Sequence, residues 1–316
     1  MNTARPRRLA IAATAALLAL TACSPDGRVT PHPSGSAAPG DGVPADGAGP
    51  AFYYLGSTAD FASTSVYRLA DGKVEELVEL EYSAAWLSAN ISADGSVVSY
   101  VTMEGRLNVI ETEPGGVTRE VVSDADPMCV EPVWSPQGHL LYGHFSRDSG
   151  MATVHIAEPG ADVGPPMGES GDCHYRYSAD GTKIVVGALG DGDVSIMDAD
   201  LSNARDDTFE IPGRVITDLS DVGPGAARIC VSTVADGDPV GDVARTLACD
   251  TVIDTATGEV VPLPMDGVLG VRFAPDGSML VRTEGELTFV GADGTPGTTI
   301  PEPAEFADYA LLDYVP

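Results

Sequence analysis

Six polar side chains in the middle of the chain have the types that bind metal ions or charged ligands. They are Asp126, Glu131, Asp172, His174, Arg176 and Asp218. Carboxylates and a neutral imidazole can together hold a divalent cation, which could then activate water for hydrolytic or lyase chemistry. The same residues can equally form a charged, solvated surface that holds no metal. Their spacing alone fits both interpretations.

Motifs for other chemistries are missing from the sequence. No G-x-S-x-G elbow, P-loop or dinucleotide fingerprint occurs. The acidic stretch 190–200, "GDGDVSIMDAD", has alternating aspartates but lacks the Gly-then-Glu arrangement of an EF-hand loop, so we interpret it as a structural turn. The sequence therefore predicts no catalytic residue, no cofactor and no dedicated metal site.

The elements that must position these side chains are short strands. From residue 51 onward, apolar or alternating runs are separated by Gly, Asp and Pro turns, and no long amphipathic helix is evident. Three turns recur at a spacing of 43 residues, in "ISADGSVVSYV" at 91, "WSPQGHLLYGH" at 134 and "YSADGTKIVVG" at 177. A degenerate copy follows at 220 and a further copy, "FAPDGSMLVRT", at 273. A period of about 40–45 residues is typical of propeller blades.

These repeats resemble the TolB-like six-bladed β-propeller family, in which an aromatic residue precedes Ser-Pro-Asp-Gly. The matching segments are 134–138, 177–181 and 273–277, whereas Ile91 replaces the aromatic residue and Gln137 the aspartate in single copies. The resemblance covers residues 51–316. It implies an all-β, six-bladed propeller in which the connections to the inner strands converge on a channel. The six polar residues would then line its mouth, where lactonase-type propellers hold a divalent cation.

The two ends of this region are incomplete repeats. Residues 51–80 provide three strands with no inner strand before them, and 304–316 provides one strand with no hairpin after it. We expect these parts to combine into the sixth blade, which would close the ring and cover both terminal edges.

Four cysteines, Cys129, Cys173, Cys230 and Cys249, form an even set that predicts two disulfides in an exported chain. Cys230 and Cys249 flank an expected hairpin loop, 235–244, which would place them opposite each other. Cys129 and Cys173 precede the first strands of consecutive repeats, so they would lie near the same end of the channel. The alternative is that one or both of these two thiols are simply buried. The absence of CxxC and HxxxH pairs disfavours zinc.

The N-terminus has the pattern of a bacterial lipoprotein signal. Arginines precede an apolar run from Leu9 to Leu20, which is too short to span a bilayer, and "LTAC" follows. We expect residues 1–22 to be removed and Cys23 to carry the lipid, with acyl chains anchoring the protein. Residues 23–50 are rich in Pro, Gly and Ala and are expected to be a disordered tether before a propeller domain at 51–316.

The formal net charge of −30 opposes binding to nucleic acid and favours solubility. The composition is typical of a GC-rich genome, such as that of an actinobacterium. Together these features predict a monomeric propeller held on the outer face of the cell membrane by its lipid. There it would bind a protein, peptide or glycan as a scaffold, without catalysis. The alternative is a metal-dependent hydrolase or lyase with its site at the channel mouth.

Overall fold

The structure, a computed structural model, describes most of the region that the repeats cover. The described residues are 49–316 except 58–63, 81–87, 127–128, 147–150, 162, 188–191 and 241–247. The expected signal peptide, Cys23 and almost all of the expected tether lie outside these residues. Within the described residues, no helix combines the length and the apolar character needed to cross a bilayer.

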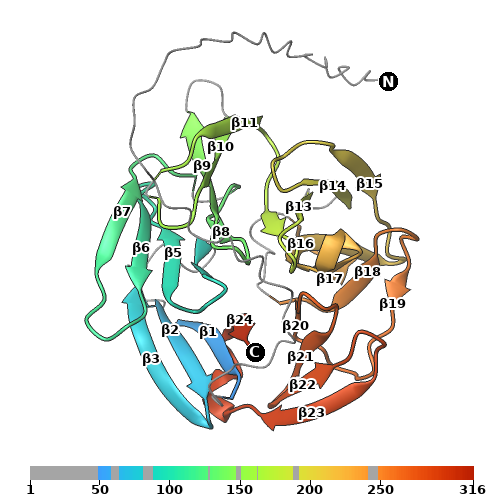
Figure 1. Ribbon diagram of the computed structural model, residues 1–316. Helices are drawn as coiled ribbons and strands as arrows, with labels where there is room; N and C mark the ends of the chain where they lie inside the picture. The colour runs from blue at the N-terminus through green and yellow to red at the C-terminus, as the bar shows by residue number, and fades with distance from the viewer. Residues whose placement is uncertain are drawn as a thin grey trace, which may run out of the picture. The chain divides into compact units, whose positions relative to one another are not determined.

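Six four-stranded antiparallel sheets surround a common axis and form the blades of a propeller (Figure 1). We number the blades in chain order and give each from the axis outward. Blade 1 contains β24 (Ala310–Val315), β1 (Ala51–Ser57), β2 (Thr64–Ala70) and β3 (Lys73–Leu80). Blade 2 contains β4 (Asn90–Ile91), β5 (Val97–Val101), β6 (Leu107–Glu111) and β7 (Thr118–Val122). Blade 3 contains β8 (Val133–Trp134), β9 (Leu140–Ser146), β10 (Met151–Ala157) and β11 (Pro166–Ser170).

The other three blades follow the same order. Blade 4 contains β12 (Tyr175–Tyr177), β13 (Lys183–Gly187), β14 (Asp193–Asp198) and β15 (Arg205–Thr208). Blade 5 contains β16 (Arg214–Val222), β17 (Arg228–Ala235), β18 (Thr251–Asp254) and β19 (Val260–Val261). Blade 6 contains β20 (Gly270–Phe273), β21 (Met279–Thr283), β22 (Glu286–Val290) and β23 (Pro296–Pro301). Short 3₁₀ turns, η1 (Pro224–Ala226) and η3 (Ala304–Phe306), precede β17 and β24.

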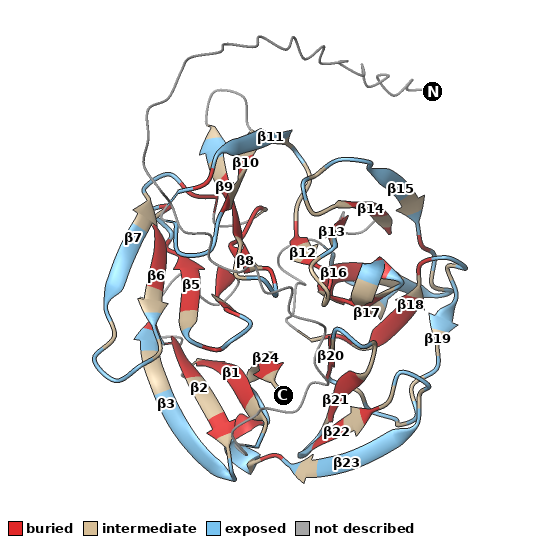
Figure 2. Ribbon diagram, in the orientation of Figure 1, coloured by how far each residue is buried: buried red, intermediate tan, exposed pale blue. Residues whose placement is uncertain are grey.

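The ring closes as the two incomplete repeats predict. β24 pairs with β1 antiparallel, with Ala51 opposite Val315 and Leu55 opposite Ala310. The six-bladed fold and its non-covalent closure are therefore confirmed. Strands next to the axis and in the middle of the blades are buried, whereas the outermost strands are mostly exposed (Figure 2). This gradient arises because neighbouring blades pack face to face and bury the apolar side chains between them.

The repeated turn is built by its aspartate and glycine. In blade 6, Asp276 Oδ1 accepts hydrogen bonds from the backbone N–H of Ser278 at 2.9 Å and from its hydroxyl at 2.6 Å. These bonds lower the pKa of Asp276. Gly277 has a φ of +84°, a left-handed conformation that glycine adopts without strain. In blade 3, Gln137 replaces the aspartate and its side-chain amide instead donates to the Asp180 carbonyl of the next blade at 3.0 Å.

Both predicted disulfides are present. Cys129 bonds to Cys173, with their Cα atoms 4.1 Å apart, and Cys230 bonds to Cys249, with Cα atoms 5.7 Å apart. The expected register around the second disulfide is wrong, however. Cys230 lies opposite Val252 rather than Cys249, because β18 begins only at Thr251. The Cys249 N–H instead donates to the Leu269 carbonyl at 3.2 Å, so the disulfide lies beside blade 6.

Candidate functional site

A cavity of about 330 Å³ follows the axis of the propeller and is lined by residues of all six inner strands. It extends from residues that precede these strands, such as Glu131, to the turns that follow them, which contribute Ala93, Pro136, Ala179 and Pro275. The mouth of the cavity on this turn side is therefore mainly apolar, and charged groups lie further along the inner strands.

One repeat position supplies a lining residue from every blade. It directly precedes the residue that occupies the aromatic position of the repeat motif. From blade 1 to blade 6, the side chains at this position are Asp313, Asn90, Val133, Arg176, Asp221 and Arg272. Charges therefore alternate around blades 4, 5, 6 and 1, whereas blades 2 and 3 contribute neutral groups. At this position, blades 4, 5, 6 and 1 therefore form a charged wall of the cavity, and blades 2 and 3 oppose it with neutral groups.

Arg272 is the most constrained member of the charged wall, with 9% of its surface exposed. Its Nε donates to the Leu312 carbonyl at 2.8 Å, and Nη2 donates to the Leu311 carbonyl, both in β24. Nη1 donates to the Ser220 carbonyl of β16 at 3.3 Å. The guanidinium of blade 6 thus connects blades 5 and 1, and backbone carbonyls occupy its donors.

Asp221 and Asp313 lie on the two blades that flank Arg272. Asp221 Oδ2 accepts the Phe273 N–H at 2.7 Å and Oδ1 accepts the Val222 N–H at 2.9 Å, while Asp313 Oδ1 accepts the Tyr314 N–H at 2.8 Å. Burial raises the pKa of Asp221, and the Arg272 charge opposes this shift. Burial raises the pKa of Asp313 to about 7, with Arg272 lowering it and the Asp221 charge raising it further. The two carboxylates therefore share one cation.

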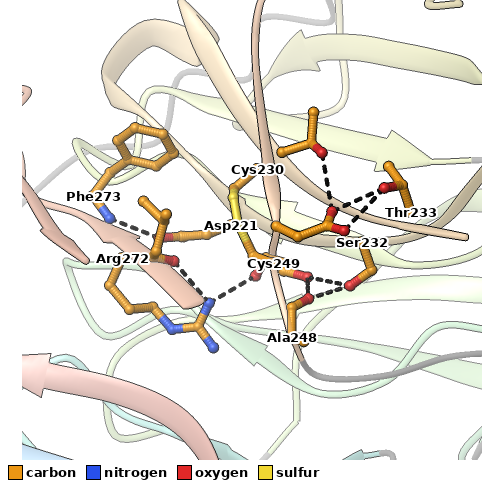
Figure 3. Close-up of a disulfide and its surroundings, with 12 residues drawn as sticks. Asp221, Cys230, Ser232, Thr233, Ala248, Cys249, Arg272 and Phe273 are labelled. Atoms are coloured by element: carbon orange, nitrogen blue, oxygen red, sulfur yellow. Dashed lines mark hydrogen bonds between the residues drawn. A yellow bond between two sulfur atoms is a disulfide. The ribbon is translucent and has the colours of Figure 1, made fainter. Parts of the chain in front are cut away.

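The second disulfide lies directly behind Asp221 (Figure 3). Cys230 is the cross-strand partner of Asp221 in β17, and both cysteines are fully buried. Arg272 and Phe273, which contact Asp221 or its strand, lie on the side of Asp221 opposite to the disulfide in Figure 3. The disulfide therefore fixes the strand that supports the charged wall.

Three of the six polar residues predicted from the sequence line the cavity, namely Glu131, Arg176 and Asp218. Glu131 joins two elements, because its Oε1 lies 3.3 Å from His174 Nδ1 and its Oε2 lies 3.9 Å from Arg176 Nη1. Glu131 and His174 are 2% and 1% exposed. This cluster is an interblade contact between the segments that lead into β8 and β12.

The other three predicted residues lie outside the cavity lining. His174 contacts Glu131 from outside the cavity lining. Asp126 Oδ1 accepts a hydrogen bond from the Cys129 N–H at 3.0 Å and thus supports the first disulfide. The Asp172 N–H donates a hydrogen bond to the Ser170 hydroxyl oxygen at 3.0 Å, within a local turn. The structure thus divides the predicted set into a cavity group and a group that shapes the connections before the inner strands.

The metal-dependent alternative required three or more of these carboxylates and His174 to converge. Among the residues described, no group of three or more His, Cys, Asp or Glu side chains is arranged to hold a metal ion. The carboxylates of the cavity are instead distributed among several blades.

Sequence reasoning missed Asp221, Arg272 and Asp313, although a signal for two of them was available. Arg272 directly precedes the aromatic residue of its repeat, as Arg176 does, and Asp313 precedes Tyr314 in the closing strand. Aligning this one position across the repeats would have identified the ring. Asp221 is harder to find, because β16 has register shifts at Ile216/Asp218 and at Leu219/Asp221.

Comparisons with known proteins support the fold. No family model matches the sequence, and no curated protein matches it. Among solved structures, TolB from Acinetobacter baumannii is similar, with a TM-score of 0.50 and 16% identity over 80% of this chain. The match covers 64% of that TolB, less than two thirds of its length.

Two enzymes are also among the similar structures. Oligogalacturonate lyase from Vibrio parahaemolyticus has a TM-score of 0.45 and 12% identity, over 79% of this chain and 76% of the lyase. The periplasmic gluconolactonase of Pseudomonas aeruginosa has a TM-score of 0.43 and 14% identity, over 85% of this chain and all of that protein. At these identities, the comparisons establish what this chain resembles in architecture: a six-bladed β-propeller similar to that of TolB.

Proposed function

We propose that this protein is a lipid-anchored, extracytoplasmic β-propeller that binds a partner at its axial cavity as a scaffold of the cell envelope, without catalysis of its own. The partner is a protein, peptide or glycan that presents a narrow group to the cavity, and the propeller acts as a monomer. The proposal assigns recognition to the cavity and location to the N-terminal segment.

The observation that carries the binding role is the cavity itself, lined by one equivalent residue from each of six blades. Concave sites with a few fixed polar groups in apolar walls are the usual ligand sites of proteins. The polar groups here are fixed by backbone hydrogen bonds, as for Arg272 with the Leu312 carbonyl at 2.8 Å. A ligand would therefore meet a preformed site, which reduces the ordering cost of binding.

The location rests on the sequence of the N-terminus, with its apolar run, the "LTAC" motif and Cys23. The similarity to a TolB structure is compatible with an envelope role, but it is evidence for the fold alone. Two disulfides agree with an oxidising compartment outside the cytoplasm.

Crosslinking from the cavity mouth tests the binding role. A photoreactive amino acid is placed at Ala93 or Ala179, which line the mouth, and at the exposed Glu120 of β7 as a control. In cells, the mouth positions should give one discrete adduct that Glu120 does not give. Equal labelling from all three positions, or none from the mouth, would contradict recognition at the cavity.

Substitution of Cys23 tests the anchor separately. Cys23→Ala should move the protein from the membrane fraction to the medium or the soluble envelope fraction, because its acyl chains would be lost. A variant that stays in the membrane fraction would show that the lipoprotein interpretation is wrong.

A further inference from the structure

We infer that the axial cavity recognises an organic cation, and this inference rests on the proposed binding role. The cation is a primary ammonium or guanidinium group on a short apolar stem, held between Asp221 and Asp313. Such a group is carried by a lysine or arginine side chain of a partner and by free aliphatic amines. The shared chemistry is the same for both sources.

The charges of the cavity wall support a cation. Four carboxylates line it, from Glu131, Asp218, Asp221 and Asp313, against two guanidinium groups, from Arg176 and Arg272. Arg176 lies 3.9 Å from Glu131, which balances one carboxylate. Arg176 and Arg272 both act on Asp221, and Arg272 acts on Asp313. Four carboxylates against two guanidinium groups leave the cavity lining with an excess of negative charge when the aspartates are ionised.

The Arg272 guanidinium has little capacity for further acceptors, because four hydrogen bonds to the carbonyls of Leu311, Leu312, Ser220 and Val271 use most of its five N–H groups. An incoming anion would have to displace these bonds and would face Asp221 and Asp313 as well. An incoming ammonium can instead donate hydrogen bonds to both aspartates, which accept hydrogen bonds from backbone N–H groups of Val222, Phe273 and Tyr314. The same arrangement therefore favours cations and disfavours anions.

The shape of the cavity favours an organic cation over a metal ion. Its carboxylates belong to separate blades, and no set of three His, Cys, Asp or Glu ligands converges among the described residues. The mouth presents Ala93, Pro136, Ala179 and Pro275, which can contact methylene groups. An alkylammonium stem satisfies both zones, with its apolar part at the mouth and its charge at the aspartates.

Two further features support this site. The Cys230–Cys249 disulfide lies behind Asp221, so one of the two carboxylates is fixed before a ligand arrives. The pKa of Asp313 is raised to about 7. The Asp313 carboxylate therefore takes up a proton near neutral pH. A bound ammonium group would lower the pKa of Asp313 and displace that proton.

Calorimetry with three probes of matched length tests the inference on the full chain, purified in detergent. The probes are 1,5-diaminopentane, 1,5-pentanediol and glutarate. The diamine should bind at least tenfold more tightly than the diol, and glutarate should not bind. Asp313→Asn should weaken diamine binding about tenfold, whereas Glu284→Gln, which removes an exposed negative charge from the hairpin between β21 and β22, should leave it unchanged.

The pH dependence in the unmodified protein keeps the test valid if a variant does not fold. Diamine affinity should rise from pH 6 to pH 8, because Asp313 becomes ionised as the pH passes its pKa of about 7. The groups that interact with Asp313 are Asp221, Arg272, Tyr53 opposite it in β1 and the neighbouring Tyr314. Burial raises the pKa of both tyrosines, so they stay neutral from pH 6 to pH 8, and the arginine stays charged throughout this range.

A lysine-bearing peptide and its acetylated form distinguish the two sources of the cation. Binding of the peptide but not of the diamine would identify a partner side chain as the source, and binding of both would identify the shared group. Three results would overturn the inference. They are tighter binding of glutarate than of the diamine, unchanged diamine affinity in Asp313→Asn, and displacement of the diamine by micromolar Ca²⁺ or Zn²⁺. Discrete crosslinks from the mouth with no diamine or lysine-peptide binding would overturn the cation while leaving the binding role intact.

Discussion

Blade 6 contains two buried arginines that both support the closing strand, yet their surroundings differ. Arg282 of β21 is 4% exposed and forms two hydrogen bonds with Glu302, at 2.7 Å and 3.1 Å, between Nε and Oε1 and between Nη2 and Oε2. It also donates to the Phe306 and Tyr309 carbonyls before β24 and lies 5.5 Å from the centre of the Tyr54 ring. Arg272 of β20 has carbonyl partners but shares its charge with two aspartates at the cavity.

The difference separates a structural cation from one at a binding site. Arg282 has a carboxylate of its own in a bidentate contact, so its charge is balanced inside the protein. Around Arg272, the balance depends on pH, because Asp313 titrates near neutrality. We infer that Arg282 only stabilises the closure of the ring. Arg272 also stabilises it, but the charges of Asp221 and Asp313 beside it remain available to a ligand in the cavity.

The largest effect is expected for Glu302→Ala. This change leaves the buried Arg282 charge without its carboxylate, and breaking such a pair from one side costs about 3–5 kcal/mol of unfolding free energy. Urea unfolding should show the loss at pH 5 as strongly as at pH 8, because the arginine stays charged at both pH values. A loss below about 1 kcal/mol would mean that the pair does not secure the closure.

Arg272→Met should have a smaller effect that depends on pH. It removes hydrogen bonds from a charged group to carbonyls of β24 and β16, an effect on the order of 2–3 kcal/mol. It also leaves Asp221 and Asp313 without their shared cation. Because these aspartates can take up protons, the loss should be smaller at pH 5 than at pH 8. Equal losses at both pH values would remove the distinction from Arg282.

Asp313→Asn isolates the titration at the cavity. The pKa of Asp313 is raised from 3.8 to about 7 in the folded protein, so the folded state holds this proton more tightly than the unfolded state. Its contribution to stability is therefore present below pH 4, falls as the pH rises to about 7, and is constant above that. The asparagine variant should lack this decline and should exceed the wild type in melting temperature at pH 8. A steeper decline in the variant would contradict the assignment.

The smallest effect is expected for Glu75→Ala, which serves as the surface reference for the Arg282 pair. Arg68 and Glu75 lie 2.5 Å apart, but their side chains are 42% and 48% exposed. Water screens such pairs, so the unfolding free energy should change by about 0–1 kcal/mol, and less in 0.5 M salt. A larger loss would show that contact distance outweighs burial in this chain.

The repeats and the composition of the turns were sufficient to predict the fold. Turns at a spacing of 43 residues located the blades, and the incomplete repeats at 51–80 and 304–316 predicted the closing pair β24 and β1. Both disulfides could also be predicted, because equivalent repeat positions and a shared hairpin bring cysteines together. These features are local or periodic, so they can be found in one sequence.

The site could be predicted only in part. Which side chain of a short inner strand faces the axis depends on register, and β16 changes register twice within its length. Glu131 and His174 were both predicted to line the channel mouth, but their contact at 3.3 Å places them in an interblade cluster in which only Glu131 reaches the cavity. Burial decides the role of such residues, and burial requires the packing of two blades at once.

The pairing of β1 with β24 also has a kinetic consequence. The first blade is started by the first strand of the domain and completed by the last, so its edge at Ala51–Ser57 has no inner neighbour until almost the whole chain is available. Contacts this distant in sequence form slowly and leave an unpaired edge that can aggregate in the meantime. A chain that must cross a membrane before folding would meet this requirement naturally, since its final strand would arrive on the far side together with the conditions that oxidise its cysteines.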